Sequence, residues 1–472
     1  MQTHIKPQTF HGRLLMIGFG CIGQGVLPLL LRHIDMPPSR IQVIAADDAG
    51  AELAQAHRVA LQVLSLTHEN LREAITPCAG NGDFVLNLSV DVSSIALIAL
   101  CQELGALYLD TCIEPWLGGY VDRNLPPARR SNYALREAAL ALRGTGADAP
   151  TAVLTHGANP GLVSHFVKQA LLDIATDIGL PHQVPTQRED WARLAQRLHV
   201  RVIHIAERDT QVALPRKAAG EFVNTWSVDA FVSEASQPAE LGWGSHERHF
   251  PVDAAQHAGG SHAAIYLQRP GATTRVRTWT PLSGPQHAFL ITHGESISIA
   301  DHLTLGDPLR PAYRPTVHYA YHPCDDAVLS LHELAGREGR LQPLTRVVKD
   351  QIVSGHDELG VLLMGHARGA YWYGSQLGIT HARALCPHNS ATSLQVTVAV
   401  MAGVAWAMQN PIRGIVEPDD MPFEQILAIC RPYLGDLVGT YTDWTPLVAR
   451  NGLFEEDIDR SDPWQFKNFR VT

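Results

Sequence analysis

The sequence predicts an α/β fold in which a doubly wound parallel sheet is followed by a second, α+β domain with a largely antiparallel sheet. In the first third of the chain, short apolar strands alternate with helix-length segments, a pattern typical of a parallel sheet with helices on both faces. From about residue 165 to 380, strand-like segments dominate, which favours an antiparallel sheet. We therefore expect a nucleotide-type domain over residues 1–160, an α+β domain over 161–380 and a C-terminal segment over 381–472.

The first element, in LLMIGFGCIGQGVLPLLL, is a buried strand that turns into a helix across three glycines. Gly18 suits the tight turn, Gly20 lets a ligand approach the backbone, and Gly23 lets the helix pack close to the strand. The amides at the helix start, at Cys21 and Ile22, then face a pyrophosphate. The alternative is a glycine turn that binds nothing. The strand before the turn and the helix after it favour a Rossmann-type dinucleotide site.

The following strands predict which dinucleotide is bound. IQVIAADD reads as a second strand that ends in Asp47 and Asp48. An acid at this point bonds a ribose 2′-hydroxyl and repels a 2′-phosphate, which favours NAD over NADP. FVLNLSV and LYLDTCIEPW predict further strands, and ligands bind outside the carboxyl ends of strands in such sheets. The candidate cofactor residues at these two strand ends are Asn87, Asp110 and Thr111.

The later elements begin with TAVLTHGANPGLVSHFVKQALLDIA, which predicts a strand, a tight turn at Asn159-Pro160-Gly161 and a long amphipathic helix. Strands are expected in RVIHIAE, HAFLITHGESISI and VLLMGHARGAYWYGSQL. LQVTVAVMAGVAWAM, residues 394–408, predicts a buried helix that packs back on the nucleotide domain. No apolar run reaches the length of a membrane helix, so no membrane partner is expected.

The composition narrows the function classes. The chain has 472 residues, 45% hydrophobic and 18% charged, and a net charge of -10, which argues against a nucleic-acid partner and favours a cationic one. Its start lacks a signal pattern, and seven cysteines without a C-x-x-C pair are typical of a reduced, cytoplasmic protein. His246, His249, His257 and His262 fall in a Gly-rich stretch, so we expect a solvated loop and no metal.

Five segments carry a resemblance to a known family: MIGFGCIGQG, NLSVDVSS, YLDTCIEPW, HGANPGLVSHFVKQAL and NTWSVDAFVSEA. Together they resemble the bacterial homospermidine synthases. The glycine turn and GANPGL are shared with the wider saccharopine dehydrogenase-like group, whereas NLSVDVSS and NTWSVDAFVSEA are more specific. The resemblance implies an NAD-dependent homodimer that makes homospermidine from two putrescines, or from spermidine and putrescine, and releases ammonia or diaminopropane. The cofactor is reduced and reoxidised within one turnover.

This chemistry demands particular residue types. A diamine arrives doubly protonated, and hydride cannot leave a carbon beside an ammonium, so one amine must lose its proton to a base while the other is held as a cation. The pocket must also retain an imine away from water. The candidate catalytic residues, to which the resemblance also points, are Asp91, Glu114, Asn159, Glu207, Trp226, Glu234 and His293.

The candidates differ in the role expected of them. Asp91 and Glu114 follow strands beside the expected nicotinamide, where a carboxylate binds an amine or accepts its proton. Trp226 and Glu234 share one segment and combine an aromatic face with an anion, which suits a cationic amine. Asn159 lies at the domain junction and is expected to orient the substrate.

Glu207 ends the strand RVIHIAE, where the sheet holds its side chain toward a cleft, and His293 precedes Gly294 on a predicted strand and is expected to relay a proton. Asp357 and Glu358, in GHDELG, are equal candidates for a further site residue.

Five of these candidates also have a structural alternative. The alternatives are a helix cap for Asp91, an ion pair with Arg208 for Glu207, core packing for Trp226, a solvated helix face for Glu234 and a buried structural role for His293. Two rival functions stay open as well. One is a net reductase of the same superfamily, whose carboxylate substrates call for arginines in the pocket, and the other is an NAD-binding protein without catalysis.

Overall fold

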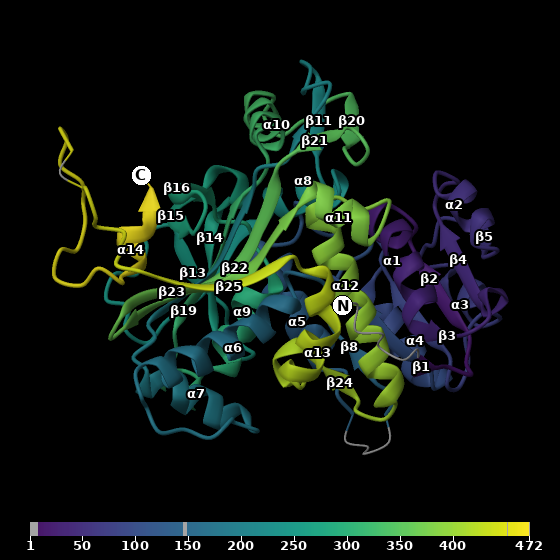
Figure 1. Ribbon diagram of the computed structural model, residues 1–472, viewed down its shortest axis with the longest axis horizontal. Helices are drawn as coiled ribbons and strands as arrows, with labels where there is room; N and C mark the ends of the chain where they lie inside the picture. The colour runs from purple at the N-terminus through teal and green to yellow at the C-terminus, as the bar shows by residue number, and fades with distance from the viewer. Residues whose placement is uncertain (1–7, 145–148, 451, 472) are drawn as a thin grey trace.

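The computed structural model describes residues 8–144, 149–450 and 452–471. Two sheets lie side by side with α12 (Ala391–Gln409) between them, the purple nucleotide-type domain on the right of Figure 1 and the teal and green second domain on the left. α12 packs on α1 (Cys21–His33) on one side and on β22 (His356–His366) and β23 (Gly369–Gly378) on the other. The predicted fold class, a doubly wound parallel sheet plus an α+β domain, is confirmed.

The first sheet has seven strands, and every pair in it is parallel. Its strands, in spatial order, are β24 (Ile415–Val416), β8 (Ala152–Val153), β7 (Leu107–Asp110), β6 (Phe84–Asn87), β2 (Leu14–Ile17), β4 (Ile41–Ala45) and β5 (Ala60–Val63). Leu14 and Met16 point into one hydrophobic cluster and Leu15 and Ile17 into another. Because side chains alternate along a strand, a strand buried on both faces reads as the continuous apolar run seen in the sequence.

The second sheet has eleven strands and is antiparallel except at β9–β19. Its main path is β13 (Ala254–Gln256), β14 (Ala264–Pro270), β12 (Pro238–Gly242), β19 (Thr316–His322), β9 (Val202–Asp209), β22, β23 and β25 (Asp436–Thr442). Beside this path lie β15 (Arg275–Thr280), β16 (Gly284–Phe289) and β26 (Arg470–Val471). The C-terminal segment therefore adds β24 to the first sheet and β25 and β26 to the second.

Helices cover both sheets. In the first domain they are α1, α2 (Ala51–Ala56), α3 (Leu71–Ile75), α4 (Ser94–Leu104) and α5 (Asn132–Leu140). Those that follow are α6 (Leu162–Asp177), α7 (Arg188–Arg197), α8 (Asp229–Ser236), α9 (Gly294–His302), α10 (Asp325–Gly336), α11 (Ile379–Leu385), α13 (Phe423–Cys430) and α14 (Phe466–Phe469).

A small lobe rises above the second sheet at the top of Figure 1. It contains α10 and two strand pairs, β11 (Glu221–Asn224) with β20 (Leu344–Val347) and β10 (Val212–Ala213) with β21 (Ile352–Ser354). Two further short pairs lie elsewhere, β1 (Gln8–Thr9) with β3 (Ile34–Asp35) and β17 (Leu305–Asp307) with β18 (Arg310–Tyr313). The lobe reaches back toward the first domain, where Lys349, just after β20, donates a hydrogen bond to Gln24 on α1.

One expectation about an individual element needs correction, and two others gain detail. HAFLITHGESISI is a strand only up to Phe289, and α9 begins at Gly294, so His293 is the residue before a helix. VLLMGHARGAYWYGSQL forms two strands, β22 and β23, joined by a turn. α12 is longer than expected, and by length and composition it is able to cross a membrane, yet 89% of its most apolar window is buried inside the protein. Its burial identifies it as a core helix.

Candidate functional site

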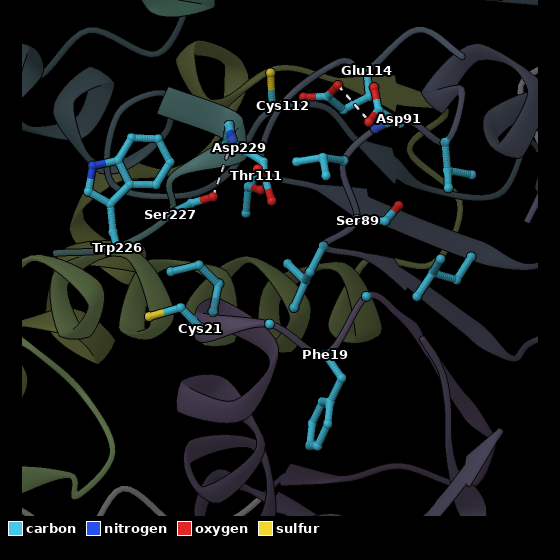
Figure 2. Close-up of a pocket in the computed structure, with 18 of the residues that line it drawn as sticks. Phe19, Cys21, Ser89, Asp91, Thr111, Cys112, Glu114, Trp226, Ser227 and Asp229 are labelled. Carbon is cyan, nitrogen blue, oxygen red and sulfur yellow. Dashed lines mark hydrogen bonds between the residues drawn. The ribbon is translucent and has the colours of Figure 1, made fainter. Parts of the chain in front are cut away.

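A cavity of about 750 Å³ lies between the two domains, over the carboxyl ends of the parallel strands. Figure 2 shows its labelled groups around one space, with Cys21 at the bottom, Asp91 and Glu114 at the top and Trp226 at the left. The sequence-predicted residues that line it are Gly18, Gly20, Cys21, Ile22, Asp47, Asp91, Thr111, Glu114, Asn159, Glu207, Trp226, Glu234 and His293. Residues far apart in the chain thus share one site, while their individual roles stay predictions.

The glycine turn has the geometry of a nucleotide cradle. Gly18 has φ of +87°, and a Cβ there would lie 2.6 Å from the Leu88 carbonyl oxygen. A Cβ at Gly23 would lie 2.7 Å from the carbonyl oxygen of Gly18, so the helix packs directly on the turn. A Cβ at Gly20, by contrast, would meet nothing within 4 Å. Because no protein contact demands glycine at position 20, the open space above it fits a ligand that approaches the backbone.

Polar groups at the strand ends complete the cofactor side of the cavity. Asp47 follows β4, is exposed and accepts a hydrogen bond from the Ala49 amide at 3.0 Å. Asp47 lines the cavity, as expected of a residue that bonds a ribose 2′-hydroxyl. Cys21 and Ile22 present the first amides of α1, whose partial positive charge favours a phosphate. The residues present therefore fit NAD.

Three of the predicted cofactor residues do not line the cavity: Gly23, Asn87 and Asp110. Asn87 Oδ1 accepts a hydrogen bond from the Ser89 hydroxyl at 2.6 Å, and Ser89 itself lines the cavity. Asp110 accepts bonds from the Thr155 amide at 2.6 Å and the Tyr108 hydroxyl at 2.8 Å. Burial raises the pKa of Asp110 to about 7 although these donors lower it. As placed here, both side chains hold the strand ends in position.

An acidic corner forms where two strand ends meet α8. The Asp91 amide donates to Glu114 Oε2 at 3.5 Å, and burial with the nearby carboxylate of Asp229 raises the pKa of Asp91. Burial also raises the pKa of Glu114 to about 8, assisted by the charges of Glu234 and Asp91. The capping alternative for Asp91 does not hold, because Ser93 caps α4 through the Ala96 amide. The corner thus has several carboxylates that a cationic amine would stabilise in the ionised form.

Glu207 lies at the far end of β9, at the floor of the second domain's part of the cavity. It is 2% exposed and accepts hydrogen bonds from Asn159 Nδ2 at 2.9 Å and from the Tyr319 hydroxyl at 2.6 Å. The ion-pair alternative does not hold, because Arg208 pairs with Asp325 at 3.1 Å. Burial raises the pKa of Glu207 to about 7, which suits a group that gains and loses a proton near neutral pH.

Trp226 lies in the loop between β11 and α8, at the edge of the cavity. Its ring packs against the main hydrophobic cluster, with the Phe231 ring 6.1 Å away, and also lines the cavity. Core packing and cation binding, the two roles considered for Trp226, are therefore compatible. A ring anchored by packing on one side presents an open face or edge to a ligand without needing to be ordered on binding.

Glu234 and His293 form a buried pair. His293 Nε2 lies 3.1 Å from Glu234 Oε2, and its Nδ1 lies 3.3 Å from Glu295 Oε1. Burial by itself lowers the pKa of His293, but Glu295 and Glu234 outweigh it and raise the pKa to about 10. The ring also packs at 4.4 Å from the Tyr319 ring. The two carboxylates therefore favour the imidazolium form of His293, which lies within hydrogen-bonding distance of Glu234, and its role as a proton relay stays a prediction.

Asp357 and Glu358 point to opposite faces of β22. Asp357 accepts a 2.5 Å hydrogen bond from the Thr392 hydroxyl, and Thr392 lines the cavity. Burial raises the pKa of Asp357, and Glu207 and Asp209 raise it further. Glu358 instead accepts bonds from the Thr280 hydroxyl and the Leu282 amide, both at 2.9 Å. Neither residue lines the cavity, and Asp357 lies on the face nearer to it.

Sequence reasoning missed several lining residues. Asp229 stands in the family-like segment NTWSVDAFVSEA, so its acidic side chain at the start of α8 was a detectable signal. Tyr319, Thr345, Val347, Thr392 and Val396 reach the cavity from β19, the lobe and α12. No local pattern marks them, because only the tertiary fold brings these elements to the site.

The four histidines of the Gly-rich stretch lie in different surroundings. His249 Nε2 lies 2.8 Å from Asp459, and His246 Nε2 lies 2.9 Å from the Trp464 carbonyl. His257 is buried and stacks on Tyr133 with the ring centroids 3.9 Å apart. The expectation of a solvated loop is therefore wrong for His257.

The described lining of the cavity carries six carboxylates, those of Asp47, Asp91, Glu114, Glu207, Asp229 and Glu234, and no lysine or arginine. Such a surface attracts cations and disfavours anionic substrates. An aromatic face beside the carboxylates further suits an alkylammonium ion.

Comparison with known proteins agrees with this geometry. The saccharopine dehydrogenase NADP binding domain matches residues 14–154, and the saccharopine dehydrogenase C-terminal domain matches residues 157–442. A homospermidine synthase of Blastochloris viridis is 56% identical over 98% of this chain and 97% of its own length. One of Mesorhizobium japonicum is 51% identical over 98% of this chain and 96% of its own.

A solved structure is similar as well. The homospermidine synthase of Legionella pneumophila in complex with NAD is 48% identical, covers 99% of both chains and superposes with a TM-score of 0.93. Identity at this level over nearly the full length, together with the two domain matches, shows that the chain belongs to the homospermidine synthase family.

Proposed function

We propose that the protein is an NAD-dependent homospermidine synthase that joins two putrescine molecules, or putrescine and an aminobutyl group from spermidine, and releases ammonia or diaminopropane. The observation that carries this proposal is the cavity, in which a nucleotide cradle adjoins six carboxylates without a lysine or arginine in the described lining. The family match supports the same activity. The polyamine substrates are cations, and the acidic lining suits them.

NAD is the cofactor that the residues fit. Gly20 and the first amides of α1 would hold its pyrophosphate, and Asp47 its ribose. The matching domain model is named for NADP, but a carboxylate at Asp47 opposes a 2′-phosphate, and the Legionella relative was solved with NAD. When bound, NAD supplies a hydride acceptor that later returns the same hydride, so the reaction has no net redox change.

Glu207 is proposed as the group that takes a proton from the reacting amine. Its pKa of about 7 leaves a large ionised fraction at neutral pH, and the bonds from Asn159 and Tyr319 fix its orientation. The neutral amine can then lose a hydride from its adjacent carbon. Burial of Glu207 keeps bulk water away from the resulting imine.

The far ammonium is proposed to lie between Trp226 and Glu234. His293 and its second partner Glu295 hold the Glu234 carboxylate in place. Asp91 and Glu114, with Asp229 beside them, would hold the second amine as it enters and attacks the imine carbon. Loss of ammonia and return of the hydride then complete homospermidine.

A net reductase of the saccharopine type is the runner-up. Its carboxylate-bearing substrates need cationic side chains, and the described lining contains neither lysine nor arginine. We also propose a homodimer, as the resemblance implies, and a cytoplasmic location, as expected from seven cysteines that are all free of disulfides.

The test is incubation with putrescine and a catalytic amount of NAD, followed by mass detection of the product. Homospermidine in large molar excess over NAD is expected, because each cofactor is regenerated within a turnover. The matched control is Glu207→Gln, which keeps the size of the side chain and should lose most of the activity. Release of NADH in proportion to the putrescine consumed would contradict the proposal and indicate an ordinary amine dehydrogenase.

A further inference from the structure

Lys349 lies just after β20, where the lobe approaches the first domain (Figure 1). Its Nζ donates a hydrogen bond to Gln24 Oε1 at 3.3 Å, and Gln24 Nε2 donates to the Phe19 carbonyl at 2.9 Å. Phe19 stands inside the glycine turn. The Lys349 carbonyl oxygen accepts a hydrogen bond from Arg383 Nη2 at 2.5 Å, which holds the backbone of Lys349 in place. The ammonium is therefore one side chain away from the nucleotide cradle, although 331 residues of chain separate it from Gly18.

The cradle is short of positive charge. The pyrophosphate of NAD carries two negative charges, while a helix N-terminus offers about half a unit charge. Gly20, the residue before α1, has no side chain to add a donor. The cavity below is lined by carboxylates, which raise the cost of bringing in an anion. A cation from outside the described lining would add to this half charge, and Lys349 lies beside the turn.

A second observation shows that the charge of Lys349 acts on Cys21, the first residue of α1. Cys21 begins α1 and lines the cavity. Burial raises the pKa of its thiol, and the charge of Lys349 acts against that rise. Lys349 is half-buried, and Thr345 and Val347, four and two residues before it, line the cavity. The whole stretch therefore borders the space above the turn.

We infer that Lys349 is the positive partner of the NAD pyrophosphate, supplied by the second domain to a turn in the first. This inference rests on the proposed function, which assigns NAD to the turn. When a phosphate is present, the flexible ammonium exchanges the amide oxygen of Gln24 for a phosphate oxygen, a stronger charge-assisted partner. The bond then joins the two domains across the cofactor, and NAD is retained while the imine waits for the second amine.

The test is calorimetric titration of NAD and ADP-ribose into Lys349→Met, Lys349→Gln and Lys349→Arg. The first two should weaken both ligands roughly ten- to a hundredfold, as expected for the loss of one hydrogen bond to a charged group. Lys349→Arg should stay within a few fold of the parent. The difference between parent and Lys349→Met should shrink at high salt, because salt screens a partly exposed charge. The matched control is Lys467→Met, which removes the same charge from the surface beside Asp457.

A readout during turnover adds a second check. If Lys349 retains the cofactor, Lys349→Met should release more free NADH per homospermidine than the parent or Lys467→Met. Adenosine, which has no phosphate, should bind all the variants equally. If Lys349→Gln weakens adenosine as much as NAD, the lysine acts through the shape of the turn and the inference is overturned.

Binding of NAD by Lys349→Met within twofold of the Lys467→Met control also overturns it. The proposed function fails separately, if the parent chain binds NAD but makes no homospermidine. If the parent does not bind NAD, both fail.

Discussion

Binding of putrescine should expel protons from the carboxylates of the cavity. Burial raises the pKa of Glu114 to about 8 and that of Glu207 to about 7. At pH 7, Glu114 is therefore mostly protonated, and Glu207 is protonated in part of the molecules. An alkylammonium ion beside a carboxylate lowers its pKa, so both groups ionise when the diamine arrives. Binding should therefore release on the order of one proton for each diamine bound at pH 7.

The release should depend on pH in a defined direction. At pH 8.5 both carboxyls have lost most of their protons, so little proton release remains. The diamine is still doubly charged there, because alkylammonium groups titrate near pH 10. Proton release therefore falls as the pH rises, while the charge of the ligand stays nearly constant.

The assay is calorimetric titration of putrescine in buffers that differ in ionisation enthalpy, with ADP-ribose in place of NAD so that no hydride transfer takes place. The slope of enthalpy against buffer ionisation enthalpy counts the protons. Glu114→Gln should remove the larger part of the release at pH 7, because the pKa of Glu114 lies above that of Glu207. Glu424→Gln, an exposed change on α13, should match the parent. Enthalpies independent of buffer at pH 7, or proton uptake, would refute the reasoning.

Three further predictions concern the turn and the amine site. Trp226→Ala should lose most activity with the fold intact, because a cation–π contact worth roughly 0.5 to 2 kcal/mol disappears, whereas Trp226→Phe should keep part of it. Glu234→Gln should lower putrescine turnover in steady-state assays and leave NAD affinity nearly unchanged, and a parent-like rate in both Trp226→Ala and Glu234→Gln contradicts this placement of the amine. Gly20→Ala should weaken NAD binding without lowering the melting temperature, whereas Gly18→Ala, at positive φ, should cost about 1 to 3 kcal/mol in denaturant unfolding. Asp47→Ala should narrow the preference for NAD over NADP in paired titrations, and an unchanged ratio argues against its contact with the ribose.

The sequence was most informative where structure is local. The strand, glycine turn and helix over residues 14–31 follow from the spacing of three glycines and a continuous apolar run, and the alternation of strands and helices predicted the parallel sheet. The stretch around His293 shows the opposite case. HAFLITHGESISI was expected to be a strand, but α9 begins at Gly294 because the surrounding packing outweighs a weak local preference.

The site itself was only partly accessible to sequence reasoning. Glu207 was expected to end a strand, whereas β9 runs on to Asp209, and it nevertheless lines the cavity. Its two hydrogen-bond donors come from the turn at Asn159 and from Tyr319 on β19. Strand β19 pairs with β9 over more than 100 residues of chain, and no local pattern specifies that pairing. The charge state of His293 likewise depends on two carboxylates that meet it only in the folded protein.

The C-terminal segment contributes strands to both sheets, and this affects how the chain folds during its synthesis. β8 is left as an open edge until residues 415–416 emerge from the ribosome, and α1 stays uncovered until α12 has been synthesised. A nascent chain that has finished the nucleotide cradle therefore still exposes an open strand edge and an apolar helix face, both of which promote aggregation. Fragments cut near residue 160 should be insoluble when produced alone and should recover only when the remainder of the chain is supplied with them.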